Sequence, residues 1–292
     1  FDLRPDMRFE TRVTGAAFDD ASNRWQVETD RGEHISAKYC VMATGCLSTP
    51  NLPDFKGLER FEGDTYHTGR WPHEEVDFTG KRVGVVGTGS SGVQSIPEIA
   101  AEAAHLTVFQ RTPNFSVPAW NGPLDAKAVQ TWKARYPELR RRARASTVGD
   151  IFEISETSAL ELAPEARDAE FERRWRQGSF NFLASFADII TSREANDFSV
   201  EFVHEKIRAR VNDPAVAALL CPSDHPLGTK RLCVDTDYYE TFNRDNVSLV
   251  DVKAAPIEEI TPRGLRAGGK EFELDAIVFA TGFDAMTGAL LN

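Results

Sequence analysis

Two stretches of the chain, one near each end, share the same succession of short apolar strands and polar turns. In both, alternating or β-branched residues predict strands, and clusters of Asp, Asn and Gly predict the turns between them. The strands predicted in the first stretch are residues 11–18, 25–29 and 39–42. Those predicted in the second are 247–252, 265–266, 272–274 and 276–279. An internal repeat of this kind indicates two copies of one nucleotide-binding module.

Each copy ends in the tripeptide Ala-Thr-Gly, which we expect to approach a bound nucleotide. These residues are Ala43, Thr44 and Gly45 in the first copy and Ala280, Thr281 and Gly282 in the second. Only the second copy has a glycine loop upstream of it in this chain. We therefore expect the loop of the first copy to precede Phe1, which would make the chain an internal fragment.

A phosphate-binding loop is predicted between an apolar strand at 83–86 and a helix at 93–103. The loop is the run Gly87, Thr88, Gly89, Ser90, Ser91 and Gly92. A Gly-x-Gly-x-x-Gly pattern is weak by itself, but a strand before it and a helix after it favour a dinucleotide site. The glycines permit the tight turn, the approach of the pyrophosphate and close helix packing. The helix N-terminus presents free N–H groups to the phosphates.

The end of the next predicted strand, 106–109, favours NADP over NAD. A site specific for NAD usually has an acidic residue there to hold the ribose hydroxyl. This chain has Gln110, Arg111 and Thr112 instead. An arginine at this point attracts a 2′-phosphate through charge-assisted hydrogen bonds, and Thr112 can add a hydroxyl donor.

Residues between 124 and 211 change to a helical pattern. Val200, Val203, Ile207 and Val211 form an apolar stripe at helical spacing. The paired modules resemble those of flavoprotein reductases and monooxygenases, in which the first binds FAD and the second NAD(P). The resemblance implies an α/β fold in which a Rossmann-like NADP-binding domain carries a helical insertion and is flanked by parts of an FAD-binding Rossmann-like domain. The expected parts are 1–48 (FAD module), 49–80 (linker), 81–120 with 226–282 (NADP domain), 121–225 (insertion) and 283–292 (return to the FAD domain).

Composition narrows the function classes. The 292 residues carry a net charge of −11, which argues against nucleic-acid or anionic-membrane binding. The four cysteines are scattered without a Cys-x-x-Cys pair, so neither a metal site nor a disulfide reductase is favoured. No apolar run reaches the roughly 18–20 residues needed to span a bilayer. We expect a cytoplasmic protein without an obligate protein partner.

The segment between the first module and the glycine loop resembles a family fingerprint. Its sequence fits Phe-x-Gly-x-x-x-His-x-x-x-Trp-Pro, with the fixed positions at Phe61, Gly63, His67, Trp71 and Pro72. This run resembles the fingerprint of Baeyer–Villiger monooxygenases. The blocks Gly-Thr-Lys-Arg, Asp-Tyr-Tyr-Glu and Phe-Asn-Arg-Asp-Asn-Val between 228 and 247 are most similar to the phenylacetone monooxygenase branch.

The resemblance implies FAD and NADP as cofactors and a small ketone and O2 as substrates. The implied reaction inserts one oxygen atom beside the carbonyl, through a flavin peroxide, to give an ester or lactone. Arg231 would be the catalytic arginine, whose fixed positive charge stabilises the anionic adduct. Lys230 would help to hold the 2′-phosphate, and His67 would have a conformational role.

Two other interpretations stay open. An N- or S-oxygenating flavin monooxygenase shares the paired nucleotide domains, although its fingerprint usually lacks the Trp-Pro ending. The chain could also be a stand-alone NADP-binding module. We expect the isolated chain to bind NADPH, to retain little FAD and to be inactive.

Overall fold

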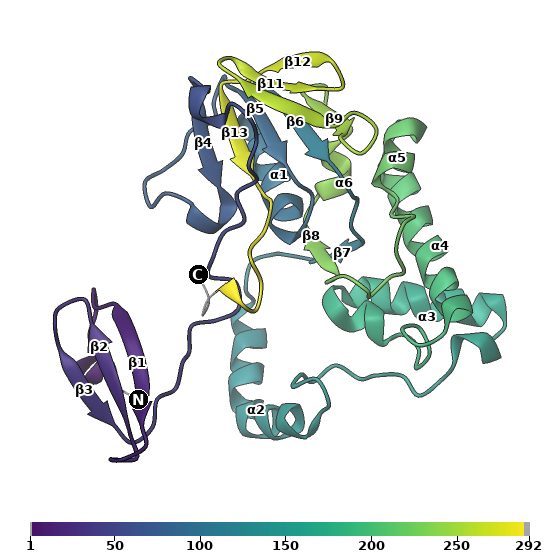
Figure 1. Cartoon of the computed structure of the whole chain (residues 1–292). Helices are drawn as coiled ribbons and strands as arrows, with labels where there is room; N and C mark the ends of the chain where they lie inside the picture. The colour runs from purple at the N-terminus through teal and green to yellow at the C-terminus, as the bar shows by residue number, and fades with distance from the viewer. Residues whose placement is uncertain (1, 289–292) are drawn as a thin grey trace. The chain divides into compact units, whose positions relative to one another are not determined.

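The computed structural model describes residues 2–288, and their contacts divide the chain into two units. One unit contains the residues up to Ser48 and those from Ala285 onward, and the other is Thr49–Asp284. Figure 1 follows the chain through both. Among the described residues, no helix combines the length and apolar character that crossing a membrane requires.

The first unit is a three-stranded antiparallel meander. Its strands are β1 (Val13–Asp19), β2 (Arg24–Thr29) and β3 (His34–Ala37), after a 3-10 helix, η1 (Arg4–Asp6). Phe18 lies opposite Trp25, and their ring centroids are 5.6 Å apart. No apolar side chain of residues 2–48 is buried, so cross-strand pairs stabilise this sheet more than a core does.

The prediction of a strand at residues 39–42 was wrong. The third strand is β3, which pairs with β2 and ends before this segment. Tyr39 and Val41 remain 76% and 88% exposed. Apolar β-branched residues form a strand only when a neighbouring backbone accepts their hydrogen bonds, and no described strand lies beside this segment.

The second unit is built on a five-stranded parallel sheet in the order β4-β13-β5-β6-β9. The strands are β4 (Asp64–His67), β13 (Ala276–Phe279), β5 (Arg82–Val86), β6 (His105–Gln110) and β9 (Val247–Asp251). The strands predicted around 83–86, 106–109 and 276–279 are central in this sheet. Their continuous apolar runs fit strands that are covered on both faces.

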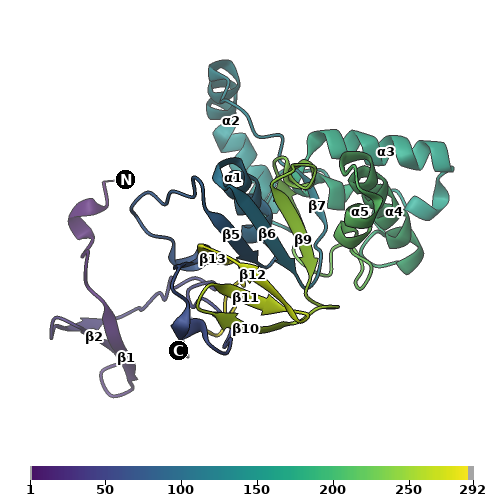
Figure 2. The ribbon, with the colours of Figure 1, turned by 90° about the horizontal axis from the view of Figure 1, so that it is seen from above.

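Alternating side chains of the central strands enter two separate clusters. Val83 and Val85 pack in the cluster that contains α1 (Ser90–Glu102), whereas Val86 packs in the cluster that contains the meander β10 (Ile257–Thr261), β11 (Gly264–Ala267) and β12 (Lys270–Glu273). Figure 2 shows α1 and the meander on opposite faces of the sheet. The unit therefore has three layers, and the phosphate-binding loop lies between the sheet and α1.

Two predictions about these elements need correction. Residues 49–80 were expected to be a linker, but β4 lies within them and pairs in parallel with β13 at the sheet edge. Residues 247–252 were expected to begin the second meander, but β9 belongs to the parallel sheet. The meander begins instead at β10, whose Ile-Glu-Glu-Ile-Thr sequence carries too many acids to resemble a strand.

Helices dominate the stretch that was predicted to be helical. The elements are α2 (Ala126–Ala145), η4 (Ala159–Glu161), α3 (Pro164–Gln177), η5 (Ser179–Ala184), α4 (Arg193–Arg210) and α5 (Pro214–Leu220). Val203 and Ile207 of the predicted stripe are fully buried in α4. A two-stranded parallel ribbon, β7 (Ser116–Pro118) with β8 (Cys233–Asp235), lies at the entry and exit of these helices and is followed by α6 (Tyr238–Thr241).

Candidate functional site

A cavity of about 620 Å³ opens at the carboxyl ends of β5, β6 and β13. The carboxyl edge of a parallel sheet is where open α/β folds bind ligands. Its lining residues are Asn51, Pro53, Phe55, Val86, Gly87, Thr88, Gly89, Phe109, Arg111, Thr112, Asn114, Lys230, Val252, Ile257, Ala280, Thr281 and Gly282. All of them belong to the second unit.

The glycine loop is closely packed at two of its glycines and open at the third. Gly87 has φ +108°, and a Cβ there would lie 2.6 Å from the carbonyl oxygen of Ala280. A Cβ on Gly92 would lie 2.3 Å from the carbonyl oxygen of Gly87, so only glycine fits at this position in the first turn of α1. At Gly89, by contrast, nothing lies within 4 Å of a Cβ, which leaves room for a ligand.

The remaining loop residues divide between the cavity and the helix. Thr88 lines the cavity, whereas Ser90, Ser91 and Gly92 form the first turn of α1 and do not. Ser90 Oγ contacts Cys233 Sγ at 3.6 Å, which connects the start of α1 to β8. The free N–H groups of this turn are directed toward the loop, as at other helix N-termini that bind phosphate.

Two cations from different parts of the chain line the cavity. Arg111 follows β6, and Lys230 precedes β8. Both are exposed, and neither forms an ion pair with a carboxylate among residues 2–288. Thr112 lies beside Arg111, and its carbonyl oxygen accepts a hydrogen bond from Thr88 Oγ1 at 3.0 Å. The cavity can therefore offer positive charge to an anionic ligand without breaking an existing pair.

The second Ala-Thr-Gly motif lines the cavity and the first does not. Thr281 Oγ1 donates to the carbonyl oxygen of Asn51 at 2.5 Å, and the N–H of Asn51 donates to the carbonyl oxygen of Gly282 at 2.9 Å. The first motif, Ala43, Thr44 and Gly45, belongs to the other unit. There, the carbonyl oxygen of Thr44 accepts a hydrogen bond from Ser48 Oγ at 2.6 Å.

His67 connects the fingerprint segment to the cavity. It is 8% exposed, at the end of β4. Its Nδ1 accepts the N–H of Gly69 at 2.9 Å, and its Nε2 lies 3.3 Å from Thr281 Oγ1. Because the Thr281 hydroxyl donates to Asn51, the ring donates from Nε2 to Thr281 Oγ1. Burial lowers the pKa of His67, which favours this neutral form.

The other fingerprint residues pack rather than line the cavity. The ring of Trp71 lies 5.5 Å from that of Tyr66 and 6.2 Å from that of Phe78. Phe61 packs against the cluster under the meander, and a Cβ on Gly63 would lie 2.4 Å from the carbonyl oxygen of Asp275. Pro72 follows Trp71 as the chain leaves the sheet edge. These contacts are structural, and the conformational role of the segment stays a prediction.

Arg231 does not line the cavity, although its neighbour Lys230 does. Its side chain is exposed and forms no hydrogen bond or ion pair within residues 2–288. The catalytic role of Arg231 therefore stays a prediction. Sequence reasoning missed Asn114, which donates to the carbonyl oxygen of Thr88 at 2.8 Å. It also missed the apolar lining residues Pro53, Phe55, Val252 and Ile257, which no motif marks.

Comparison with known proteins agrees with this architecture. Residues 6–160 match the family model described as pyridine nucleotide-disulphide oxidoreductase. The chain is 47% identical to a Baeyer–Villiger monooxygenase of Pseudooceanicola batsensis, over 98% of this chain and 53% of that protein.

Two solved structures extend the comparison to bound cofactors. The first is an oxidized steroid monooxygenase bound to NADP, which is 54% identical and has a TM-score of 0.95 over 99% of this chain and 55% of that one. The second is OTEMO in complex with FAD and NADP, which is 42% identical and has a TM-score of 0.94 over the same shares. The chain thus spans about half the length of the proteins that it matches.

Proposed function

The chain belongs to the pyridine nucleotide-disulphide oxidoreductase family, and we propose that it is the NADP-binding part of a Baeyer–Villiger monooxygenase. The observation that carries the proposal is the convergence of the glycine loop, Arg111 and Lys230 on one cavity. A dinucleotide pyrophosphate fits the loop, and a 2′-phosphate fits the two cations. Similarity to ketone-oxidising monooxygenases over nearly the whole chain supports the reaction class.

The residues of the cavity fit NADPH part by part. The N–H groups at the start of α1 and the open space at Gly89 would accept the pyrophosphate. Arg111, Thr112 and Lys230 would bind the 2′-phosphate, which carries more negative charge than the ribose hydroxyl of NADH. Val252 and Ile257 offer an apolar surface to the adenine ring. These contacts explain why NADPH would be preferred.

The proposed reaction uses a small ketone and O2 and yields an ester or a lactone. When bound, NADPH supplies a hydride, and FAD supplies the chemistry with O2. Arg231 is proposed as the cation that lies beside the developing negative charge, since arginine stays protonated in a desolvated site. His67 would couple a movement of the fingerprint segment to Thr281 at the edge of the cavity, through the hydrogen bond between their side chains.

Replacing the predicted 2′-phosphate ligand tests the cofactor assignment. In the full-length protein, we expect Arg111→Ala to weaken NADPH binding about tenfold, the cost of one charge-assisted contact, and to leave NADH binding nearly unchanged. Isothermal titration with both cofactors measures this preference. An unchanged ratio of the two dissociation constants would contradict the 2′-phosphate site.

Product analysis tests the reaction class. With NADPH, O2 and a cyclic or aryl ketone, we expect the full-length protein to form a lactone or an ester, identified by mass spectrometry. Formation of an N-oxide or S-oxide from an added amine or sulfide, with no ester or lactone from any ketone, would support the N- or S-oxygenating alternative. Consumption of NADPH without any oxygenated product would leave a nucleotide-binding module.

A further inference from the structure

The two cationic arms of the cavity are joined by the β7–β8 ribbon. β7 follows the segment that carries Arg111, and β8 follows Lys230. The strands pair in parallel, with Ser116 opposite Cys233, and the N–H of Cys233 donates to the carbonyl oxygen of Phe115 at 2.9 Å. The position of Lys230 relative to Arg111 therefore depends on how this ribbon is held.

The ribbon is held by a buried carboxylate. Asp235, the last residue of β8, has a side chain with 0% exposure. It accepts a hydrogen bond from Ser116 Oγ at 2.6 Å and forms an ion pair with Arg210 Nη2 at 3.2 Å. Burial raises the pKa of Asp235, and the hydrogen bond from Ser116 and the charge of Arg210 oppose that rise.

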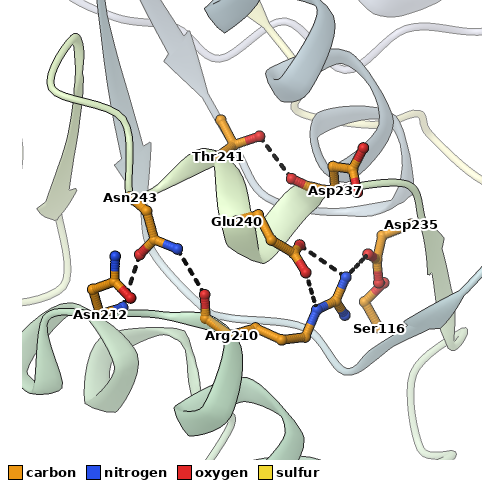
Figure 3. Close-up of polar contacts among 8 residues, drawn as sticks. All are labelled: Ser116, Arg210, Asn212, Asp235, Asp237, Glu240, Thr241 and Asn243. Carbon is orange, nitrogen blue, oxygen red and sulfur yellow. Dashed lines mark hydrogen bonds and ion pairs between the residues drawn. The ribbon is translucent and has the colours of Figure 1, made fainter.

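Arg210, the last residue of α4, connects the ribbon to α6. Its Nε and Nη2 donate to the Glu240 carboxylate at 2.5 and 2.9 Å, and Figure 3 shows the guanidinium between Glu240 and Asp235. Asn243 also donates to the carbonyl oxygen of Arg210 at 2.7 Å and accepts the N–H of Asn212 at 2.8 Å. The C-terminus of α4 is thus tied to the segment after β8 by side chains and by backbone.

Stability alone is a weak explanation for this network. Arg210 Nη1 and the Tyr239 hydroxyl are buried and have no hydrogen-bond partner among residues 2–288. A buried ion pair whose donors are incompletely satisfied stabilises a fold less than well-packed apolar residues of the same size. What the network does supply is one fixed arrangement of α4, α6 and β8.

We propose that Arg210 is a positioning residue for the preference of the cavity for NADPH over NADH. By holding Asp235 and Glu240 together, it fixes the end of β8. The pairing of β8 with β7 then positions Cys233 and, three residues before it, the backbone of Lys230, which lines the cavity. The inference rests on the proposed function, because it requires Lys230 to bind the 2′-phosphate. Arg210 itself does not line the cavity, so its effect on binding is transmitted through Lys230.

A double-mutant cycle in the full-length protein tests this transmission. We expect Arg210→Met to lower the ratio of NADPH to NADH affinity about fivefold to tenfold, with NADH affinity within about twofold of the wild type. Lys230→Met should lower the ratio at least as much. In the Lys230→Met background, Arg210→Met should then have no further effect on the ratio. Titration calorimetry with each cofactor gives all the constants.

Arg208→Met is the matched control, because Arg208 also lies on α4 but its ion pair within the described part of the chain is with Glu201 and not with β8 or α6. It should leave the ratio unchanged.

If Arg210→Met fails to fold, Glu240→Gln at the half-exposed end of the network should also lower the ratio. Suppose that Lys230→Met lowers the ratio of NADPH to NADH affinity but Arg210→Met leaves it at the wild-type value. That result would overturn the inference and leave the 2′-phosphate assignment intact. Glu240→Gln decides in the same way if it has to replace Arg210→Met. An Arg210→Met effect that persists in the Lys230→Met background would also overturn the inference. A normal ratio in Lys230→Met would instead overturn the 2′-phosphate assignment and the inference with it.

Discussion

At the scale of single residues, His67 shows how a neutral side chain can connect a distant segment to a binding cavity. A neutral ring accepts the N–H of Gly69 at Nδ1 and donates to Thr281 at Nε2, and protonation would remove the acceptor. Burial lowers the pKa of His67 below its ordinary value of 6.5, as it also does for His204. Folding therefore selects the unprotonated ring at both positions.

Acidification should weaken the fold through His67. Its folded pKa lies below its unfolded pKa, so the unfolded chain takes up a proton first, and the contribution present above 6.5 is lost as the pH falls toward the folded value. We expect His67→Asn, which keeps an acceptor for Gly69 but loses the bond to Thr281, to cost about 1 kcal/mol near neutral pH. The difference in the free energy of unfolding between the wild type and this variant should become smaller at lower pH.

Urea unfolding of both proteins at about pH 7.5 and about pH 5.5 measures this difference in the free energy of unfolding. His204 is unchanged in the variant, so its own pH dependence cancels in the comparison. A difference that stays constant or widens on acidification would show that the His67 ring is not held neutral in the folded protein.

Residues of the cavity differ in how far the sequence predicted them. The glycine loop, Arg111 and Thr112 were predicted because strand, loop, helix and the next strand follow one another along the chain. Asn114 and Pro53 were not, because they reach the cavity only through tertiary contacts. Arg231 was predicted by resemblance alone, and its place outside the cavity leaves its role untested.

At the scale of elements, the connection from β5 to α1 contains one glycine that close packing requires, Gly92, and one that faces open space, Gly89. We expect Gly92→Ala to destabilise the protein by about 2 kcal/mol or more, because the added Cβ would meet the carbonyl oxygen of Gly87. Gly89→Ala should leave stability nearly unchanged but weaken NADPH binding about tenfold or more, because its Cβ would enter the space for the pyrophosphate.

Thermal unfolding and NADPH titration of the two variants compare these effects directly. The substitutions add the same methyl group within one loop, so each serves as the control for the other. Equal losses of stability in the two variants would contradict the assignment of open space to Gly89. Unchanged NADPH binding by Gly89→Ala would place the pyrophosphate elsewhere.

Buried elements were easier to predict than edge elements. β5, β6 and β13 have apolar runs because both faces are covered, so their pattern follows from their place in the sheet. β4 and β10 lie at the edges of their sheets and carry solvent-exposed polar residues, so their sequences did not predict strands. The segment 39–42 had a strand pattern but found no partner strand, since hydrogen bonding between strands is a tertiary property.

At the scale of the whole molecule, the core lies in one of the two units. Both apolar clusters consist entirely of residues between Thr49 and Asp284. The described residues up to Ser48 bury no apolar side chain. The cavity is also lined only by the larger unit. Folding and cofactor binding should therefore be properties of that unit alone.

Expression of residues 49–284 by themselves tests this division. We expect this polypeptide to unfold cooperatively, with a midpoint within about 3 °C of the whole chain and an NADPH affinity within about twofold, since no core or cavity residue is removed. Residues 2–48 alone should be unfolded, because a three-stranded meander without a buried face cannot offset its conformational entropy. Circular dichroism and titration calorimetry measure both. Loss of NADPH binding by residues 49–284 would mean that the smaller unit contributes to the site, and the cavity as described would then be incomplete.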